Sequence, residues 1–208
     1  MIAAISLMRR QEPVSLARFR RHWLDIHGPL VCAFAGLHRY MQCHVIESPA
    51  MNDLARSMRI DGFPILFFQN DEDRAKAQGS PEMAECNIDS RLFVGAVSRV
   101  VTDVETVVPL PGERGRISLL LLFPAGSDPA AIDATLARTA RLPRLVGLAR
   151  YHVRQQGRAP ASTVDHLAVE VAAAAQARFD SIVDLEGALA DWDDPGVARF
   201  MVEEHWLV

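Results

Sequence analysis

Several features that would assign a compartment to this chain are missing from its sequence. The longest apolar run, residues 117–123, is far shorter than the ~20 residues of a membrane-spanning helix. The apolar residues 1–8 lead directly into two arginines and are too few for a signal peptide. The three cysteines, Cys32, Cys43 and Cys86, are an odd number without metal-type spacing. We therefore expect a cytoplasmic protein with reduced, buried thiols and no membrane partner.

Signatures of the common cofactors and of nucleic-acid binding are missing as well. The sequence has no phosphate-binding loop, no dinucleotide-type glycine pattern and no G-x-S-x-G nucleophile motif. Its histidines do not follow a known metal-ligand spacing. The formal net charge is −4, and no basic cluster stands out. We expect no metal, no cofactor and no nucleic-acid partner.

The richest stretch of the chain is residues 15–40, which predicts a helix followed by a strand. Ser15 is a suitable N-cap for the helix. The apolar positions at spacings of three and four form one stripe: Leu16, Phe19, Trp23, Ile26 and Leu30. At about 100° per residue, His27 falls roughly 60° to one side of this stripe and His22 roughly 80° to the other. Gly28-Pro29 should then disrupt the helix and leave His27 at its end or at a kink.

The strand expected over residues 37–46 has two different faces. Met41, Cys43 and Val45 alternate with Tyr40, Gln42 and His44. The apolar face suits a covering helix. The polar, titratable face is a candidate ligand surface if a second sheet shields it.

These residues resemble the EthD-type branch of the dimeric α/β-barrel superfamily. The resemblance is carried by FRRHWLDIHGPL at residues 19–30 and GLHRY at residues 36–40, with LMRR before them and DGFPILFF and VET after them. It covers roughly the first half of the chain. The family's usual aromatic residue before the tryptophan is His22 here, which is a departure. The resemblance implies an antiparallel sheet covered by helices, paired with a second such sheet.

The order of expected elements predicts that this unit occurs twice. Strands are expected near residues 2–8, 37–46, 63–69 and 97–108, with helices at 15–35 and, in parts, 71–95. This β-α-β-β-α-β order is the ferredoxin-like motif. GLARY at residues 147–151 repeats GLHRY, strands are expected at 117–123, 164–171 and 204–208, and helices at 128–142 and within 180–202. We predict an α+β chain with repeats at 1–109 and 117–208, a linker at 110–116, and antiparallel sheets packed face to face as an intramolecular α/β barrel.

The two predicted copies differ in their chemistry. Aligning GLHRY with GLARY without gaps places Asp133, Ala134 and Arg138 opposite His22, Trp23 and His27. The second copy therefore lacks the histidines and the tryptophan. We expect one site per chain, carried by the first copy, with Tyr40, Gln42 and His44 and the corresponding Tyr151, Val153 and Gln155 facing the space between the sheets.

His27 is the leading candidate for a general acid or base because imidazole titrates near neutrality. It could instead be a buried histidine bonded to a loop carbonyl. Tyr40 is the second catalytic candidate, as a donor to a substrate oxygen, although its recurrence as Tyr151 also fits a structural role. The remaining candidates are substrate-binding: His22, Trp23, Gln42, His44, Asp61 and Phe67. Of these, His22 is expected at the rim, Trp23 suits the core, and Asp61 could orient a histidine or cap a turn.

Two classes of function remain open. The first is a cofactor-free enzyme of lyase or isomerase type, in which a histidine moves a proton on a hydrophobic carbonyl or aromatic small molecule. The second is a non-catalytic protein that binds a small molecule, with haem as a further ligand suggested by other branches of the superfamily. A homodimer is compatible with either class.

Overall fold

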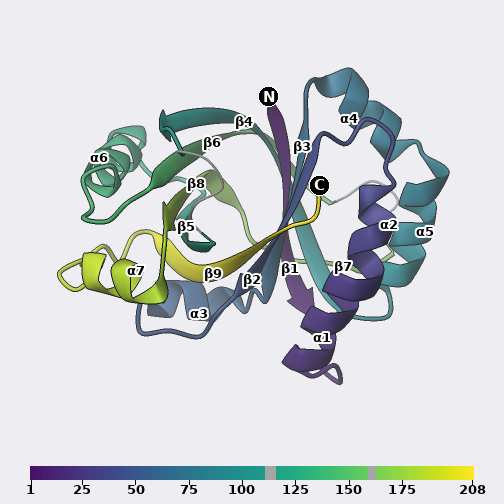
Figure 1. Ribbon diagram of the computed structural model, residues 1–208, viewed down its shortest axis with the longest axis horizontal. Coiled ribbons are helices and arrows are strands. Elements are labelled where there is room, and N and C mark those ends of the chain that lie inside the picture. The colour runs from purple at the N-terminus through teal and green to yellow at the C-terminus, as the bar shows by residue number, and fades with distance from the viewer. Residues whose placement is uncertain (111–115, 159–162) are drawn as a thin grey trace.

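In the computed structural model, which describes residues 1–110, 116–158 and 163–208, eight antiparallel strands close into a barrel (Figure 1). The strands are β1 (Ile2–Arg10), β2 (Arg39–Val45), β3 (Gly62–Phe68), β4 (Val94–Val108), β5 (Ile117–Pro124), β6 (Gly147–Gly157), β8 (Val171–Phe179) and β9 (Ala198–Trp206). They follow one another as β1-β3-β2-β9-β5-β8-β6-β4, and β4 pairs with β1 to close the ring. The short β7 (Asp165–His166) runs parallel to β4 outside the ring.

Both halves of the chain contribute four neighbouring strands in the same relative order. The first half gives β4-β1-β3-β2 and the second gives β9-β5-β8-β6. The halves are joined along two edges, where β2 pairs with β9 and β4 pairs with β6. The expected barrel is therefore confirmed, with the two sheets also bonded edge to edge. Residues 111–115 of the expected linker lie outside the described residues.

Helices cover the outside of the barrel in two groups (Figure 1). Against the first-half strands lie α1 (Leu16–His22), η1 (Trp23–His27), α2 (Gly28–Cys32), α4 (Asp71–Gln78) and α5 (Pro81–Ser90). The second half carries α6 (Pro129–Thr139) and α7 (Ile182–Ala188), and α3 (Asp53–Met58) packs near β9. None of the helices in the described part of the chain is long and apolar enough to cross a membrane.

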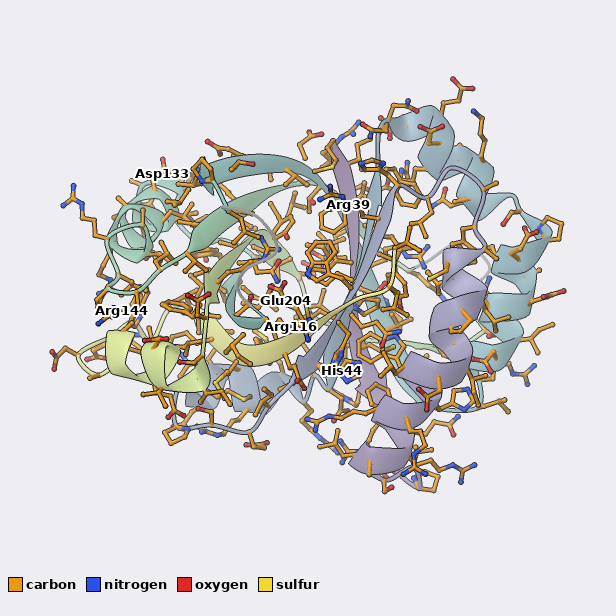
Figure 2. All side chains as sticks on the ribbon, viewed as in Figure 1. Arg39, His44, Arg116, Asp133, Arg144 and Glu204 are labelled. Carbon is orange, nitrogen blue, oxygen red and sulfur yellow. The ribbon has the colours of Figure 1, made fainter. Side chains whose placement is uncertain are left out.

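The apolar face of β2 points into the barrel, which corrects the predicted orientation of this strand. Met41, Cys43 and Val45 belong to the core inside the ring, whereas Tyr40 packs outward with the covering helices. Figure 2 shows His44 on the helix side of β2, whereas Glu204 of β9 lies within the barrel. The apolar face points inward because the interior of the closed barrel is filled by the side chains of its own strands. The polar face points outward, where the covering helices supply hydrogen-bond partners.

The helix does not break at Gly28-Pro29, contrary to the expectation from the sequence. It continues from Leu16 to Cys32 through a π-helical turn, η1, and Pro29 occupies the first turn of α2. Proline cannot donate a hydrogen bond and clashes with the carbonyl four residues earlier in a regular α-helix. The wider π-turn lies directly before this proline. It also changes which side chains are buried, because Ile26 is 52% exposed while His27 and Val31 are buried.

Two other expectations are wrong in their boundaries. Residues 47–60, predicted as a plain loop, contain α3, and their Met51, Ala55 and Ile60 join the barrel core. In the second half, the third strand is β8 at Val171–Phe179 rather than residues 164–171, and the closing strand begins at Ala198. The alanine run of β8 has high helix propensity, but its small side chains fit between the barrel and its covering helices.

Candidate functional site

The π-helical turn brings two histidines onto one face of the first helix. Residues five apart point about 140° away from each other in a regular α-helix. In a π-helix the hydrogen bonds run from residue i to i+5, as from Gly28 N–H to the Trp23 carbonyl. His22 and His27 therefore both face α5, which corrects the expectation that they lie on different sides. π-Turns of this kind occur frequently at functional sites.

Both imidazoles bind one carboxylate, that of Asp89 on α5. His27 Nδ1 lies 2.8 Å from Oδ2, and His22 Nε2 lies 2.9 Å from Oδ1. A carboxylate only accepts hydrogen bonds, so these two ring nitrogens carry the protons. Burial opposes the charge on Asp89, but the hydrogen bonds from His27 and His22 outweigh it and hold the pKa of Asp89 below its usual range. Asp89 is therefore a buried, ionised orienting group.

The second nitrogen of His27 faces the thiol of Cys86, one turn before Asp89. Cys86 Sγ lies 3.3 Å from His27 Nε2. Burial raises the pKa of Cys86 to about 12, and the negative charge of Asp89 adds to that effect. The thiol thus stays protonated near neutral pH and can donate weakly to Nε2. Phe93 closes the cluster, because its ring packs against both His22 and His27.

A second polar network attaches the helix to β2. Trp23 Nε1 donates to the Tyr40 hydroxyl at 3.0 Å, and Gln42 Nε2 donates to the Trp23 carbonyl at 2.8 Å. The ring of Trp23 stacks on His44, with centroids 4.5 Å apart, and His44 Nε2 bonds Gln42 at 2.9 Å. Burial raises the pKa of Tyr40 well above its usual value, so the phenol keeps its proton. These contacts hold the π-turn against the sheet.

A glycine on β3 makes this close approach of the helix feasible. A Cβ atom built on Gly62 would overlap the ring of Trp23. Any larger residue at this position would have to displace the tryptophan. The sequence of β3 is therefore matched to the large side chain of the helix.

A cavity of about 70 Å³ lies between the first-half sheet and the helices α2 and α5. His27, Tyr40 and Cys86 contribute to its wall. Apolar side chains make up much of the rest, and Arg99 of β4 supplies a charge. Thirteen further residues line it: Ser6, Met8, Val31, Phe34, Pro64, Leu66, Met83, Asn87, Ser90, Val94, Val97, Thr163 and Val164. The candidate site therefore lies under the first helix and not between the two sheets.

The structure brings together only part of the residue set expected from the sequence. His27 and Tyr40 line the cavity, and His22 reaches it indirectly through Asp89. Trp23, Gln42 and His44 form the supporting network beside it. Their burial under the helix replaces the predicted position between the sheets.

Asp61 and Phe67 lie away from this cavity. Asp61 forms an ion pair with Arg10 and lines a separate surface groove. Phe67 points into the barrel and stacks on Trp206, with centroids 6.0 Å apart. Tyr151 also packs inside the barrel, whereas Tyr40 packs outside it. The repeated GL-x-R-Y motif therefore does not place its two tyrosines in equivalent positions.

Three residues of the site were not singled out from the sequence: Cys86, Asp89 and Arg99. Cys86 and Asp89 are three apart on a helix, so they share a face. That spacing is a weak signal, because it identifies no partner. Arg99 stands on the outward face of β4, where an isolated arginine normally faces solvent.

Comparisons with solved structures find several whose fold resembles that of this chain over nearly its whole length. An anthrone oxidase-like protein aligns with a TM-score of 0.63 at 11% identity, covering 99% of this chain and 92% of its own. A monooxygenase candidate from Fusobacterium nucleatum subsp. nucleatum ATCC 25586 aligns with a TM-score of 0.59 at 5% identity, covering 98% of this chain and 91% of its own. A monooxygenase candidate from Lactobacillus acidophilus NCFM aligns with a TM-score of 0.53 at 8% identity, covering 100% of this chain and 95% of its own. At these identities the likeness concerns the fold alone.

The sequence itself matches the EthD domain family over residues 11–96. This range includes the π-turn, Tyr40, Cys86 and Asp89, so all of the histidine cluster falls within the matched part. No curated protein matches the chain.

Proposed function

We propose that the chain is an EthD-like, cofactor-free enzyme of isomerase or dehydratase type that moves a proton on a small hydrophobic carbonyl or aromatic compound. The observation that carries this proposal is the bond from His27 Nδ1 to the buried carboxylate of Asp89, with Nε2 turned toward the cavity side chain of Cys86. An oriented imidazole beside an apolar cavity is suited to general acid–base catalysis.

The proton path follows from these contacts. His27 Nε2 takes a proton from the carbon next to the substrate carbonyl, and the electron pair moves onto the carbonyl oxygen. Asp89 stabilises the imidazolium that forms, and the Tyr40 phenol donates a hydrogen bond to the developing oxyanion. The imidazolium then returns the proton to another carbon in an isomerase, or to a leaving hydroxyl in a dehydratase.

Cys86 fits this scheme better as a thiol than as a nucleophile. Its distance to His27 and the distance of His27 to Asp89 are those of a nucleophilic triad. However, a nucleophilic cysteine needs a lowered pKa, and burial raises that of Cys86 to about 12. We therefore propose that the Cys86 thiol hydrogen-bonds His27 Nε2 in the free protein. The substrate takes the place of the thiol when it binds.

The alternative is a protein that binds a small molecule without converting it. The same cavity supports this function, since apolar walls with a few polar groups are typical of ligand sites. Haem fits the residues poorly, because pockets for drug-sized or larger ligands have ~300–1,000 Å³ and this cavity has about 70 Å³. Each nitrogen of His27 also already has a neighbour.

We further infer that residues 1–109 and 117–208 are two ferredoxin-like copies of one ancestral unit. The equal strand orders of the two halves support this. The outer core of the second half is built mainly of aliphatic and aromatic residues such as Leu119, Leu136 and Phe179. This composition is consistent with a single site per chain, in a cytoplasmic protein that keeps its cysteines reduced.

Exchange of carbon-bound protons tests the enzymatic function with model compounds in place of the natural substrate. The purified chain would be incubated in D₂O with small 1,3-dicarbonyl compounds and unsaturated lactones, and loss of proton signals followed by NMR. The proposal predicts catalysed exchange for some of these compounds and a rate ~10²–10⁴-fold lower for His27→Asn.

His38→Asn is the matched control, because His38 is an exposed histidine at the start of the same sheet region. It should leave exchange unchanged. Binding of a compound with no exchange above the solvent rate would favour the binding protein. Full exchange by a folded His27→Asn variant would refute the assignment of His27.

A further inference from the structure

Arg99 is the one side chain with a permanent charge among the cavity-lining residues that the structure describes. It lies on β4 opposite Ser6 of β1, which also lines the cavity. Much of the wall around it is apolar, including Met8, Leu66 and Val97. The cavity therefore combines apolar surface with a single cation.

The half-buried Arg99 differs from Arg178, the buried arginine inside the ring, in having no counter-ion among the residues that the structure describes. Arg178 donates to Glu204 at 2.9 Å. Within residues 1–110, 116–158 and 163–208, the guanidinium of Arg99 forms no hydrogen bond or ion pair. Burial lowers the pKa of Arg99, and the positive charge of Arg74 acts in the same direction. Charges that are removed from water are normally paired, so a half-buried guanidinium without a partner is suited to an anionic ligand.

We propose that the ligand of this cavity is a small monocarboxylate whose acid group pairs with Arg99 while its apolar, unsaturated or carbonyl-bearing part lies toward His27. The orientation toward His27 rests on the proposed function, but the pairing with Arg99 does not. The planar guanidinium presents two parallel N–H donors that match a carboxylate. One arginine suits a monoanion, and a cavity of about 70 Å³ suits a compact molecule.

Crotonate and crotonamide form a suitable pair of probes. Both are small unsaturated molecules of nearly equal shape, and only crotonate carries a negative charge. Titration of each into the isotopically labelled chain, followed by NMR, gives the two dissociation constants. We expect crotonate to bind about tenfold or more tightly, because a hydrogen bond to a charged group is stronger than one between neutral groups. Equal affinities would overturn the proposal.

Variants test whether Arg99 causes the preference for crotonate over crotonamide. Arg99→Gln should bring the two affinities to the same value, and Arg99→Lys should keep part of the preference for crotonate. Arg74→Gln is the matched control, since Arg74 is a neighbouring cation that does not line the cavity and pairs with Asp71. The Arg74→Gln variant should keep the preference for crotonate over crotonamide. A preference that survives Arg99→Gln, or one that disappears in Arg74→Gln alone, would overturn the pairing.

Thermal unfolding gives a readout that needs no ligand. If Arg99 is an unpaired ligand-binding cation, Arg99→Met should raise the melting temperature or leave it unchanged, because the mutation removes a partly desolvated charge and breaks no ion pair. A clear fall would indicate a structural arginine and refute the proposal. His27→Asn should keep the preference for crotonate while slowing proton exchange by the ~10²–10⁴-fold expected above. Absence of exchange activity in the wild type, with the preference for crotonate present, would refute the proposed catalysis alone.

Discussion

His22 and His27 are five residues apart and yet bind the two oxygens of the same carboxylate, at 2.9 and 2.8 Å. Only the π-helical turn between them makes this arrangement compatible with one helix. Asp89 thereby fixes the tautomer of His27, with Nδ1 protonated and Nε2 directed toward Cys86. The chemistry of the site depends on a backbone irregularity as much as on residue types.

Replacement of Asp89 should uncouple both histidines from α5. In Asp89→Asn the neutral amide replaces the charged acceptor that both imidazoles share. We therefore expect the free energy of unfolding to fall by roughly 1–3 kcal/mol. We also expect the Nδ1-protonated tautomer of His27 to lose its dominance, which imidazole ¹⁵N shifts would report. Asp25→Asn, at an exposed position of the same helix, is the control and should change neither. Unchanged shifts and stability in Asp89→Asn would mean that the carboxylate does not orient His27.

His44 should make the protein less stable as the pH falls from about 6.5. Burial, helped by the positive charges of His205 and Arg20, lowers the pKa of His44 to about 3. Between these two values the unfolded chain binds a proton that the folded chain does not, so stability decreases toward acid by up to ~1.4 kcal/mol per pH unit. His44→Gln should flatten this part of the curve in urea denaturation. The exposed His38→Gln should keep the wild-type slope, and an unaltered slope in His44→Gln would contradict the assignment.

Gly62→Ala should disturb the packing of Trp23. The new methyl group would overlap the indole, so it cannot be accommodated without a shift. We expect a loss of roughly 1–3 kcal/mol from overpacking, measured by urea denaturation, with a change in tryptophan fluorescence. Gly187→Ala is the matched control, because Gly187 lies in α7 and no atom of the described residues is within 4 Å of a new Cβ there. It should be neutral or stabilising by roughly 0.5–1 kcal/mol. Equal behaviour of the two variants would contradict the proposed fit.

The parts of the fold that could be predicted are those that depend on local pattern. Alternation identified β2, and the apolar spacing identified the first helix. Alternation could not decide which face of β2 enters the barrel, because that choice depends on the closure of the sheet by β9. The alanine run of β8 was missed because the packing of small side chains in the barrel wall overrides helix propensity.

The histidine cluster shows a different limit of sequence reasoning. His27 was identified from a local motif, but its partner Asp89 is 62 residues away along the chain. The 100° periodicity also separated His22 from His27, since a π-turn has no simple signal in the residues that form it. Pro29 is the nearest sequence feature to this turn, and it favours an end of the helix as readily as a π-turn.

The barrel should be a single folding unit, so that residues 1–110 alone do not form a stable monomer. Their inner sheet face contributes Ile5, Met41 and Phe63 to a core that also contains Leu120 and Phe200 of the second half. The edge strands β2 and β4 would in addition lose their partners β9 and β6. An exposed apolar sheet face with two open edges favours aggregation or pairing with a second copy.

Light scattering coupled to size exclusion, together with thermal melting, separates these outcomes. Aggregation, or a homodimer that restores an eight-stranded ring, agrees with the expectation. A soluble, cooperatively melting monomer would contradict it, because the first half would then bury its sheet face without the second.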